Sequence, residues 1–173
     1  MAKHLVGEIH ALSVADTARF YGMLGICSFY IGEDYRCYYC LNKIDAYVNH
    51  LDYVEDENKY QYWLDTLFMK YILQAMILVQ EGKFIEAKDK FDLAQKIMNM
   101  DKEKRYFSYL LYVQELARYY DLLRNEEGRQ SILQEGIDYC EKNGYRQRSS
   151  VLMTELMRGR EIGKKGLVLK RRV

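Results

Sequence analysis

Proline is absent from the 173 residues, and so is an excess of charge of either sign. Because proline breaks helix interiors, its absence leaves the whole chain free to form helix. The 26 basic and 25 acidic residues give a net charge of +1, so we expect no direct binding of nucleic acid. No apolar run approaches the roughly 18 residues that span a bilayer, and residues 1–12 lack the apolar segment of a signal peptide. We therefore expect a cytoplasmic protein with no membrane span.

Catalytic motifs are also missing from the chain. It contains no Gly-rich phosphate loop, no GxSxG and no HExxH. Its three histidines, His4, His10 and His50, stand outside any motif, and an isolated histidine is more often a surface or satisfied residue than a base. We therefore expect no catalytic residues and no cofactor, and the sequence predicts a protein that is not an enzyme.

The four cysteines lie within apolar helical patterns, which favours small, reduced core residues. Cys37 and Cys40 form a CxxC, and a helix would place both thiols on one face as half of a zinc site. A structural zinc site needs four ligands, and the sequence has no second CxxC or HxxxH. We therefore expect no metal site.

Hydrophobic residues make up 49% of the chain, enough for a packed core, and strong helix formers fill its middle. The hydrophobic spacing predicts an all-α fold with a short helix at 3–11 before the main ones. We predict helix N-caps at Asp34 and Asp101 and a helix stop at Asn143-Gly144. The predicted main helices are 13–31, 35–51, 57–80, 84–99, 102–123, 127–142 and 147–161.

The clearest candidate for an internal repeat lies at residues 71–98. It reads as two amphipathic helices joined at Gly82, where a residue without a Cβ can adopt a positive φ. Small residues on both helices allow a close approach, and two phenylalanines fill the space between them. The positions that carry this pattern are Tyr71, Ala75, Gly82, Phe84, Ala87, Phe91 and Ala94.

This pattern resembles the tetratricopeptide repeat. In that family, helix A carries an aromatic and a small residue before a glycine turn, and helix B carries an aromatic, a small, a large apolar and a second small residue. The resemblance covers residues 21–143. It implies a right-handed superhelix of antiparallel helix hairpins, with about three repeats and a C-terminal helix.

Two further copies follow the same frame. The interval between matching positions of the two helices is 19 in each copy: Gly25 to Ile44, Ala75 to Ala94 and Ala117 to Gly136. The third copy departs from the pattern, because Arg129 occupies a small-residue position and the turn at 124–126 lacks glycine. Successive copies are 50 and 42 positions apart, against about 34 in a standard repeat. Long helices or connections are therefore expected, with residues 49–59 as the longest connection.

Helix A lines the concave face of the superhelix in this family, so the resemblance implies a groove that binds a peptide or protein. Chaperone-binding members clamp a carboxylate with lysine and asparagine, but apolar residues and glycine stand at those positions here, so that activity is not expected. The 17 tyrosines suit core packing or such a groove. Alternatively, a further helix fills the groove and its residues are core. The predicted groove residues are Arg19, Ile26, Phe29, Tyr30, Met69, Ile72, Met76, Val79, Gln114, Arg118 and Asp121.

The end of the chain is basic, with seven Lys and Arg residues between positions 158 and 172 against Glu161 alone. Gly163 and Gly166 are expected to interrupt the last helix. We therefore expect a repeat domain at 1–162 and a basic tail or linker at 163–173. The tail is either a solvated end, a contact with nucleic acid or a membrane surface, or a linker to an output domain outside this sequence, and we favour the linker.

The resemblance extends to sensory regions that precede diguanylate cyclase domains and to ligand-binding regions of peptide-responsive transcription regulators. It therefore implies a regulatory module of a signalling protein. The alternative is a structural scaffold or homodimerisation domain, in which apolar helix faces are buried against a second copy.

Overall fold

The computed structural model describes residues 14–50, 57–100 and 106–170, with side chains over 16–48, 60–100 and 108–158. The described residues form α-helices and turns and contain no strand, which confirms the all-α prediction. The helix predicted at 3–11 and the N-cap predicted at Asp101 lie outside these ranges. The helices are α2 (Val14–Tyr30), α3 (Asp34–His50), α4 (Glu57–Gln80), α5 (Phe84–Met100), α6 (Tyr106–Leu122), α7 (Glu126–Lys142) and α8 (Arg146–Lys170).

Helix α8 differs most from its predicted range. It continues to Lys170, so Gly163 and Gly166 do not interrupt it as the sequence suggested. A glycine inside a helix costs only about 1 kcal/mol relative to alanine, and no proline follows to stop the helix. The predicted boundary at residue 162 therefore does not coincide with a helix end.

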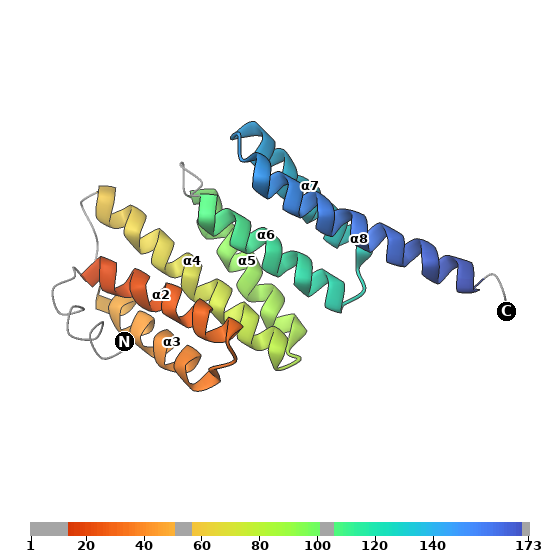
Figure 1. Cartoon of the computed structure of the whole chain (residues 1–173). Coiled ribbons are helices and arrows are strands. Elements are labelled where there is room, and N and C mark those ends of the chain that lie inside the picture. The colour runs from red at the N-terminus through yellow and green to blue at the C-terminus, as the bar shows by residue number, and fades with distance from the viewer. Residues whose placement is uncertain (1–13, 51–56, 101–105, 171–173) are drawn as a thin grey trace. The chain divides into compact units, whose positions relative to one another are not determined.

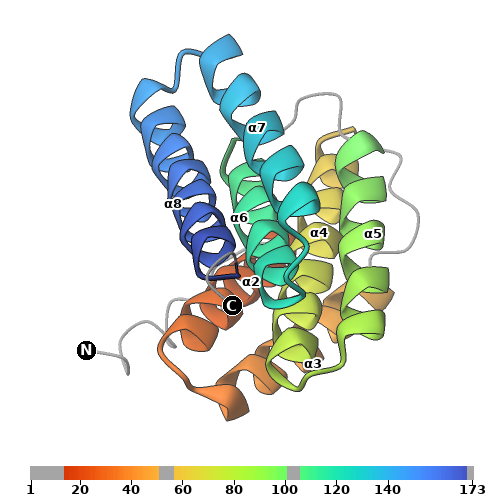
Figure 2. The same ribbon diagram turned by 90° about the vertical axis from the view of Figure 1, so that its right-hand side faces the viewer.

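The chain separates into two compact units, Met1–Ser108 and Tyr109–Val173. The first unit contains two antiparallel hairpins, α2 with α3 and α4 with α5, and α2 also packs on α4 (Figure 1). In the second unit α6, α7 and α8 follow one another, with α7 and α8 side by side (Figure 2). Three hairpins and a final helix agree with the predicted order of elements.

Glycine allows α2 to lie close to its neighbours in the first unit. A Cβ added at Gly25 would lie 2.4 Å from Cδ2 of Leu73 on α4 and 3.1 Å from Cβ of Cys40 on α3. One turn earlier, a Cβ at Gly22 would lie 2.9 Å from Cβ of Met69. These distances are shorter than van der Waals contact, so a larger residue would force the helices apart.

In the second unit a glycine likewise allows α7 to lie close to α6 and α8. A Cβ added at Gly136 would lie 2.7 Å from Val113 on α6 and 3.0 Å from Leu152 on α8. Beside this contact, the Tyr109 hydroxyl donates to a carboxylate oxygen of Glu135 at 2.9 Å. Burial, followed by the Glu135 charge, raises the pKa of Tyr109 well above its usual value, so this phenol keeps its proton.

Arg129, which stands at a small-residue position of the third copy, is buried between α7 and α8. Its Nη2 donates to the backbone carbonyl of Glu155 at 2.5 Å, and its Nη1 lies 3.4 Å from a carboxylate oxygen of Glu126. Its Nε lies 3.7 Å from a carboxylate oxygen of Asp121. The guanidinium is thus satisfied on three sides, as a buried charge requires, and it attaches α8 to α7.

Four turns between consecutive helices share one hydrogen-bond pattern. After α2, Gly32 N–H donates to the Phe29 carbonyl at 3.1 Å, and Glu33 N–H donates to the Ser28 carbonyl at 2.9 Å. The same pair of bonds recurs at the turns after α4, α6 and α7. This is the Schellman arrangement, which needs a left-handed residue after the helix. That residue has φ of 76° at Gly32, 74° at Gly82, 55° at Arg124 and 77° at Gly144.

The helix ends correct one prediction and confirm two others. The first backbone bonds of α3 run to the Glu33 carbonyl, so Glu33 is the N-cap and Asp34 is the first helical residue. The positive φ at Gly82 and the helix stop at Asn143-Gly144 are both present. At the turn without glycine, Asn125 caps α7, because its side chain accepts from Gly128 N–H at 3.0 Å. This cap compensates for part of the strain at the preceding residue.

Replacing Arg124 with glycine should raise the free energy of unfolding by about 1 kcal/mol, because glycine adopts a positive φ without a Cβ clash. Urea denaturation followed by circular dichroism measures the change. The control is Arg118→Gly in the interior of α6, where the same substitution should lower the free energy by about 1 kcal/mol. A decrease for Arg124→Gly would contradict the strain assigned to this turn.

Gly25→Val should lower the free energy of unfolding by about 1–3 kcal/mol, because the branched side chain would overlap Leu73 and Cys40. The same measurement on Cys27→Val is the matched control. Cys27 is exposed two positions further along α2, and its replacement should change stability by no more than about 0.5 kcal/mol. Equal effects at the two positions would show that α2 does not depend on close packing at Gly25.

Candidate binding surface

Four of the predicted groove residues are buried. Ile26, Met69, Ile72 and Met76 each have less than a tenth of their surface exposed. Met69 packs against α2 at Gly22. These side chains act as core residues in this structure and are not accessible to a ligand. This agrees with the alternative that these positions are core, and it removes the methionines from the exposed part of the predicted groove.

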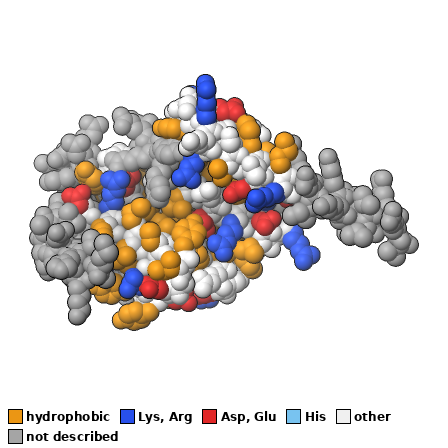
Figure 3. All heavy atoms as spheres, viewed as in Figure 1, with side chains coloured by type: hydrophobic (Ala, Val, Ile, Leu, Met, Phe, Trp, Pro, Cys, Tyr) orange, Lys and Arg blue, Asp and Glu red, His pale blue; other side chains and the backbone are white. Residues whose placement is uncertain are grey.

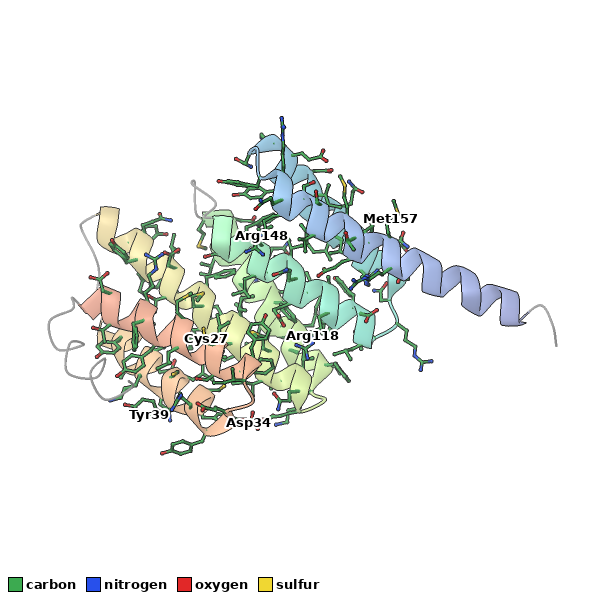
Figure 4. The ribbon with its side chains drawn as sticks, in the orientation of Figure 1. Cys27, Asp34, Tyr39, Arg118, Arg148 and Met157 are labelled. Atoms are coloured by element: carbon green, nitrogen blue, oxygen red, sulfur yellow. The ribbon has the colours of Figure 1, made fainter. Side chains whose placement is uncertain are left out.

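The other predicted groove residues reach the surface to different extents. In the first unit Arg19 and Tyr30 are exposed, while Phe29 and Val79 are half-buried. In the second unit Arg118 and Asp121 are exposed on α6, and Gln114 is half-buried (Figure 4 labels Arg118). A groove that includes all of these residues stays a prediction. Arg19 and Tyr30, however, lie on one surface that the structure describes.

That surface is the outer side of α2. Arg19, Met23, Cys27 and Tyr30 follow one another at intervals of four, four and three residues, which places them on one side of a helix. Met23 is 37% exposed and Tyr30 is 55% exposed, and Cys27 is exposed between them. Hydrophobic side chains gather over α2 in the space-filling view (Figure 3). We call these four residues the α2 face.

The α2 face contains two residues, Met23 and Cys27, that the resemblance did not indicate. The signal that predicts them is the row of small residues on the opposite side, Ala18, Gly22 and Gly25, all of which are buried. Tyr21 and Ile26 are buried beside these small residues, while Met23 and Tyr30 remain on the outside.

A small cavity of about 100 Å³ lies where the start of α3 meets the end of α4. At this place the Tyr38 hydroxyl donates to a carboxylate oxygen of Glu81, and the Gln80 amide donates to Asp34 at 3.4 Å. Lys83 Nζ lies 2.7 Å from the other Glu81 oxygen. The residues that line the cavity are Asp34, Cys37, Tyr38, Ile77, Gln80 and Glu81.

This network connects the two hairpins of the first unit. The bond from Lys83, and then the bond from Tyr38, lowers the pKa of Glu81 below its usual value. The bond to Glu81 also raises the pKa of Tyr38, so the phenol keeps its proton and donates it. Both carboxylates already accept hydrogen bonds from within the protein. We therefore interpret the cavity as a gap beside a structural contact between α3 and α4.

The CxxC pair is part of the core. Cys37 and Cys40 are buried, and the Cys37 thiol donates to the Gly25 carbonyl at 3.5 Å. Burial raises the pKa of Cys40 to about 11 and also raises the pKa of Cys37. Both thiols therefore stay protonated near neutral pH, unlike the thiolates of metal sites. Within the described residues, no three His, Cys, Asp or Glu side chains are grouped so that they could hold a metal ion.

One segment of α4, Tyr60–Gln80, is long and apolar enough to span a membrane by length and composition alone. Charged and polar residues such as Asp65 and Lys70 interrupt this segment, so it contains no continuous apolar run of that length. In the structure 61% of its most apolar window is buried inside the protein, as in a core helix of a soluble fold. Length and composition alone do not distinguish a membrane-spanning helix from a buried core helix.

No protein-family model matches the sequence, and comparisons with curated proteins and with solved structures found no significant relative. The resemblance to the tetratricopeptide repeat therefore rests on the residues that carry it. A functional assignment depends on the surfaces described above.

The thiols should differ in their reaction with an alkylating reagent. We expect Cys27 to be modified in the folded protein, because it is exposed on the α2 face. Cys37, Cys40 and Cys140 should react only after unfolding, because they are buried and burial raises the pKa of each thiol. Mass spectrometry of the alkylated protein measures the pattern, with urea-unfolded protein as the control. Early modification of Cys37 or Cys40 would contradict the core position of the CxxC pair.

Proposed function

We propose that this chain is a non-catalytic helical-repeat module that binds a peptide or protein segment on the α2 face. The observation that supports this proposal is the position of Met23, Cys27 and Tyr30 on the exposed side of a helix whose other side is packed. Contiguous apolar residues at a surface commonly mark an interaction site. Methionine adapts its shape to a partner, and tyrosine combines a large apolar ring with a polar hydroxyl.

The dimensions and chemistry of the α2 face suggest the kind of ligand. From Arg19 to Tyr30 the helix rises roughly 16 Å, which equals about five residues of an extended peptide. Arg19 provides a positive charge at one end of the α2 face, and the other three residues of the face, Met23, Cys27 and Tyr30, are apolar or aromatic. A short apolar segment with an acidic group at one end therefore complements this surface. On this proposal, binding regulates an attached output domain of an intracellular signalling protein.

A second copy of the chain is the alternative occupant, since the same apolar residues would serve a homodimer. Sedimentation over a range of concentrations distinguishes the two. A dimer that becomes monomeric when Met23 is replaced with glutamate would favour the scaffold function. A monomer with an accessible α2 face would favour the ligand-binding function.

Selection of linear peptides from a display library, followed by affinity measurement with purified peptides, tests the proposal. Met23→Glu should lower the affinity for the selected peptides by about tenfold or more, because it places an unpaired carboxylate within an apolar contact. Ile85→Glu is the control, because Ile85 is 80% exposed on α5, away from the α2 face. Equal affinity of the wild type and Met23→Glu, with both proteins folded by circular dichroism, would show that the α2 face is not the binding site.

A further inference from the structure

Over residues 146–158, whose side chains the structure describes, helix α8 is packed on one side only. Its contacts with α7 use Leu152, Leu156 and Ser149, all of which are buried. Arg129 fastens the same side through its bond to the Glu155 carbonyl. These residues lie within one narrow sector of the helix, so the rest of its surface is open over the described side chains.

The open side of α8 exposes apolar groups. Met153 is 41% exposed and Met157 is 61% exposed, and they are one turn apart on the same side of the helix (Figure 4 shows Met157). Arg146 and Ser150 continue this row toward the start of α8. Val151, which is 44% exposed, lies on the other flank. We call Arg146, Val151, Met153, Met157 and Arg158 the α8 face.

The charge on the α8 face has one sign. The exposed charged residues between positions 146 and 158 are Arg146, Arg148 and Arg158, while the only carboxylate on this stretch, Glu155, is half-buried. None of these three guanidinium groups forms a salt bridge with a carboxylate among the described residues. The sequence after Arg158 adds six more basic residues against Glu161. The face thus combines apolar contact area with positive charge that no carboxylate of the described residues pairs with.

We propose that the α8 face docks an acidic amphipathic helix of a partner protein. Apolar side chains of that helix pack against Met153 and Met157, and its carboxylates pair with the arginines at the two ends of the face. From Arg146 to Arg158 the helix rises ~18 Å, so a partner helix of about 12 residues covers the face. Arginine is suited to this role because its planar fork pairs with carboxylates through two hydrogen bonds.

Charge argues against a second copy at this position. Antiparallel pairing of two α8 helices would bring Arg146 and Arg148 of one copy near Arg158 of the other, and like charges repel. Nucleic acid would use the arginines but would leave the exposed methionine and valine side chains without a role. The combination of apolar and basic groups therefore favours an acidic protein helix. This inference concerns a different surface from the α2 face and does not depend on the proposed function.

The test uses a fluorescent peptide of about 12 residues, with glutamate in its first and last turns and leucine on one side of its centre. Fluorescence anisotropy measures its affinity for the full chain. One matched peptide carries lysine in place of glutamate, and another carries serine in place of leucine. We expect the acidic peptide to bind about tenfold or more tightly than either matched peptide.

Variants of α8 connect this affinity to the proposed face. Met153→Glu combined with Met157→Glu should lower the affinity for the acidic peptide by about tenfold. Arg146→Glu combined with Arg158→Glu should reverse the preference toward the lysine peptide, which a loss of folding would not produce. Ile85→Glu on α5, which lies outside both proposed faces, should leave the affinity for the acidic peptide unchanged.

Three results would overturn the proposal. The first is no binding of the acidic peptide, and the second is equal binding by the wild type and the methionine variant. The third is tighter binding of duplex DNA, or of vesicles of phosphatidylserine and phosphatidylcholine, that depends on the arginines and not on the methionines. That last result would assign the α8 face to phosphate groups.

Discussion

Close contact between helices at glycine and alanine is the constraint on which the rest of this structure depends. At Gly22, Gly25 and Gly136 the neighbouring side chains occupy the space that a Cβ would need. Ala75, Ala87 and Ala94 are completely buried in the α4–α5 hairpin. Because these small side chains take up little volume, the backbones of neighbouring helices can approach closely along their contact. The close approach of α2 to α3 and α4, and of α7 to α6 and α8, therefore depends on these small residues.

This constraint also explains the surfaces proposed for binding. The packed side of α2 holds small residues together with Tyr21 and Ile26, while Met23 and Tyr30 lie outside it and remain exposed. On α8 the packed side holds Leu152 and Leu156, and Met153 and Met157 lie outside that side and are exposed. Exposed apolar groups carry a cost in water unless a partner covers them. The α8 face carries more positive charge than the α2 face, and its arginines form no salt bridge with a carboxylate among the described residues.

The sequence predicted the helices well because their signals are local. Proline is absent, hydrophobic residues recur at helical intervals, and Gly32, Gly82 and Gly144 mark three of the turns. Two local features were harder to predict. The turn at Arg124 forms without glycine, because the bonds of the Schellman arrangement and the Asn125 cap outweigh the strain at one residue. Helix α8 passes through three glycines, including Gly163 and Gly166, because each costs less than a break in its hydrogen bonds.

The candidate site was only partly predictable from the sequence. Arg19 and Tyr30 were among the groove residues carried over from the repeat resemblance, and both are exposed. Ile26, Met69, Ile72 and Met76 came from the same resemblance but are buried. Helical spacing identifies which residues share a side of a helix, yet it does not state which side a neighbouring helix will cover. Likewise, Asp34 and Glu81 accept hydrogen bonds from Gln80 and Tyr38 only because α3 and α4 meet.

By itself, the sequence determined the helical class, the positions of the turns and the small residues that allow close packing. Each of these depends on backbone propensity and side-chain volume within a few residues along the chain. The tertiary structure alone decided which apolar side chains are core and which form the α2 and α8 faces. It also decided that the CxxC thiols are buried and that Arg129 is satisfied by a backbone carbonyl of α8. Exposure and pairing of this kind depend on residues distant in sequence, which meet only when the helices pack.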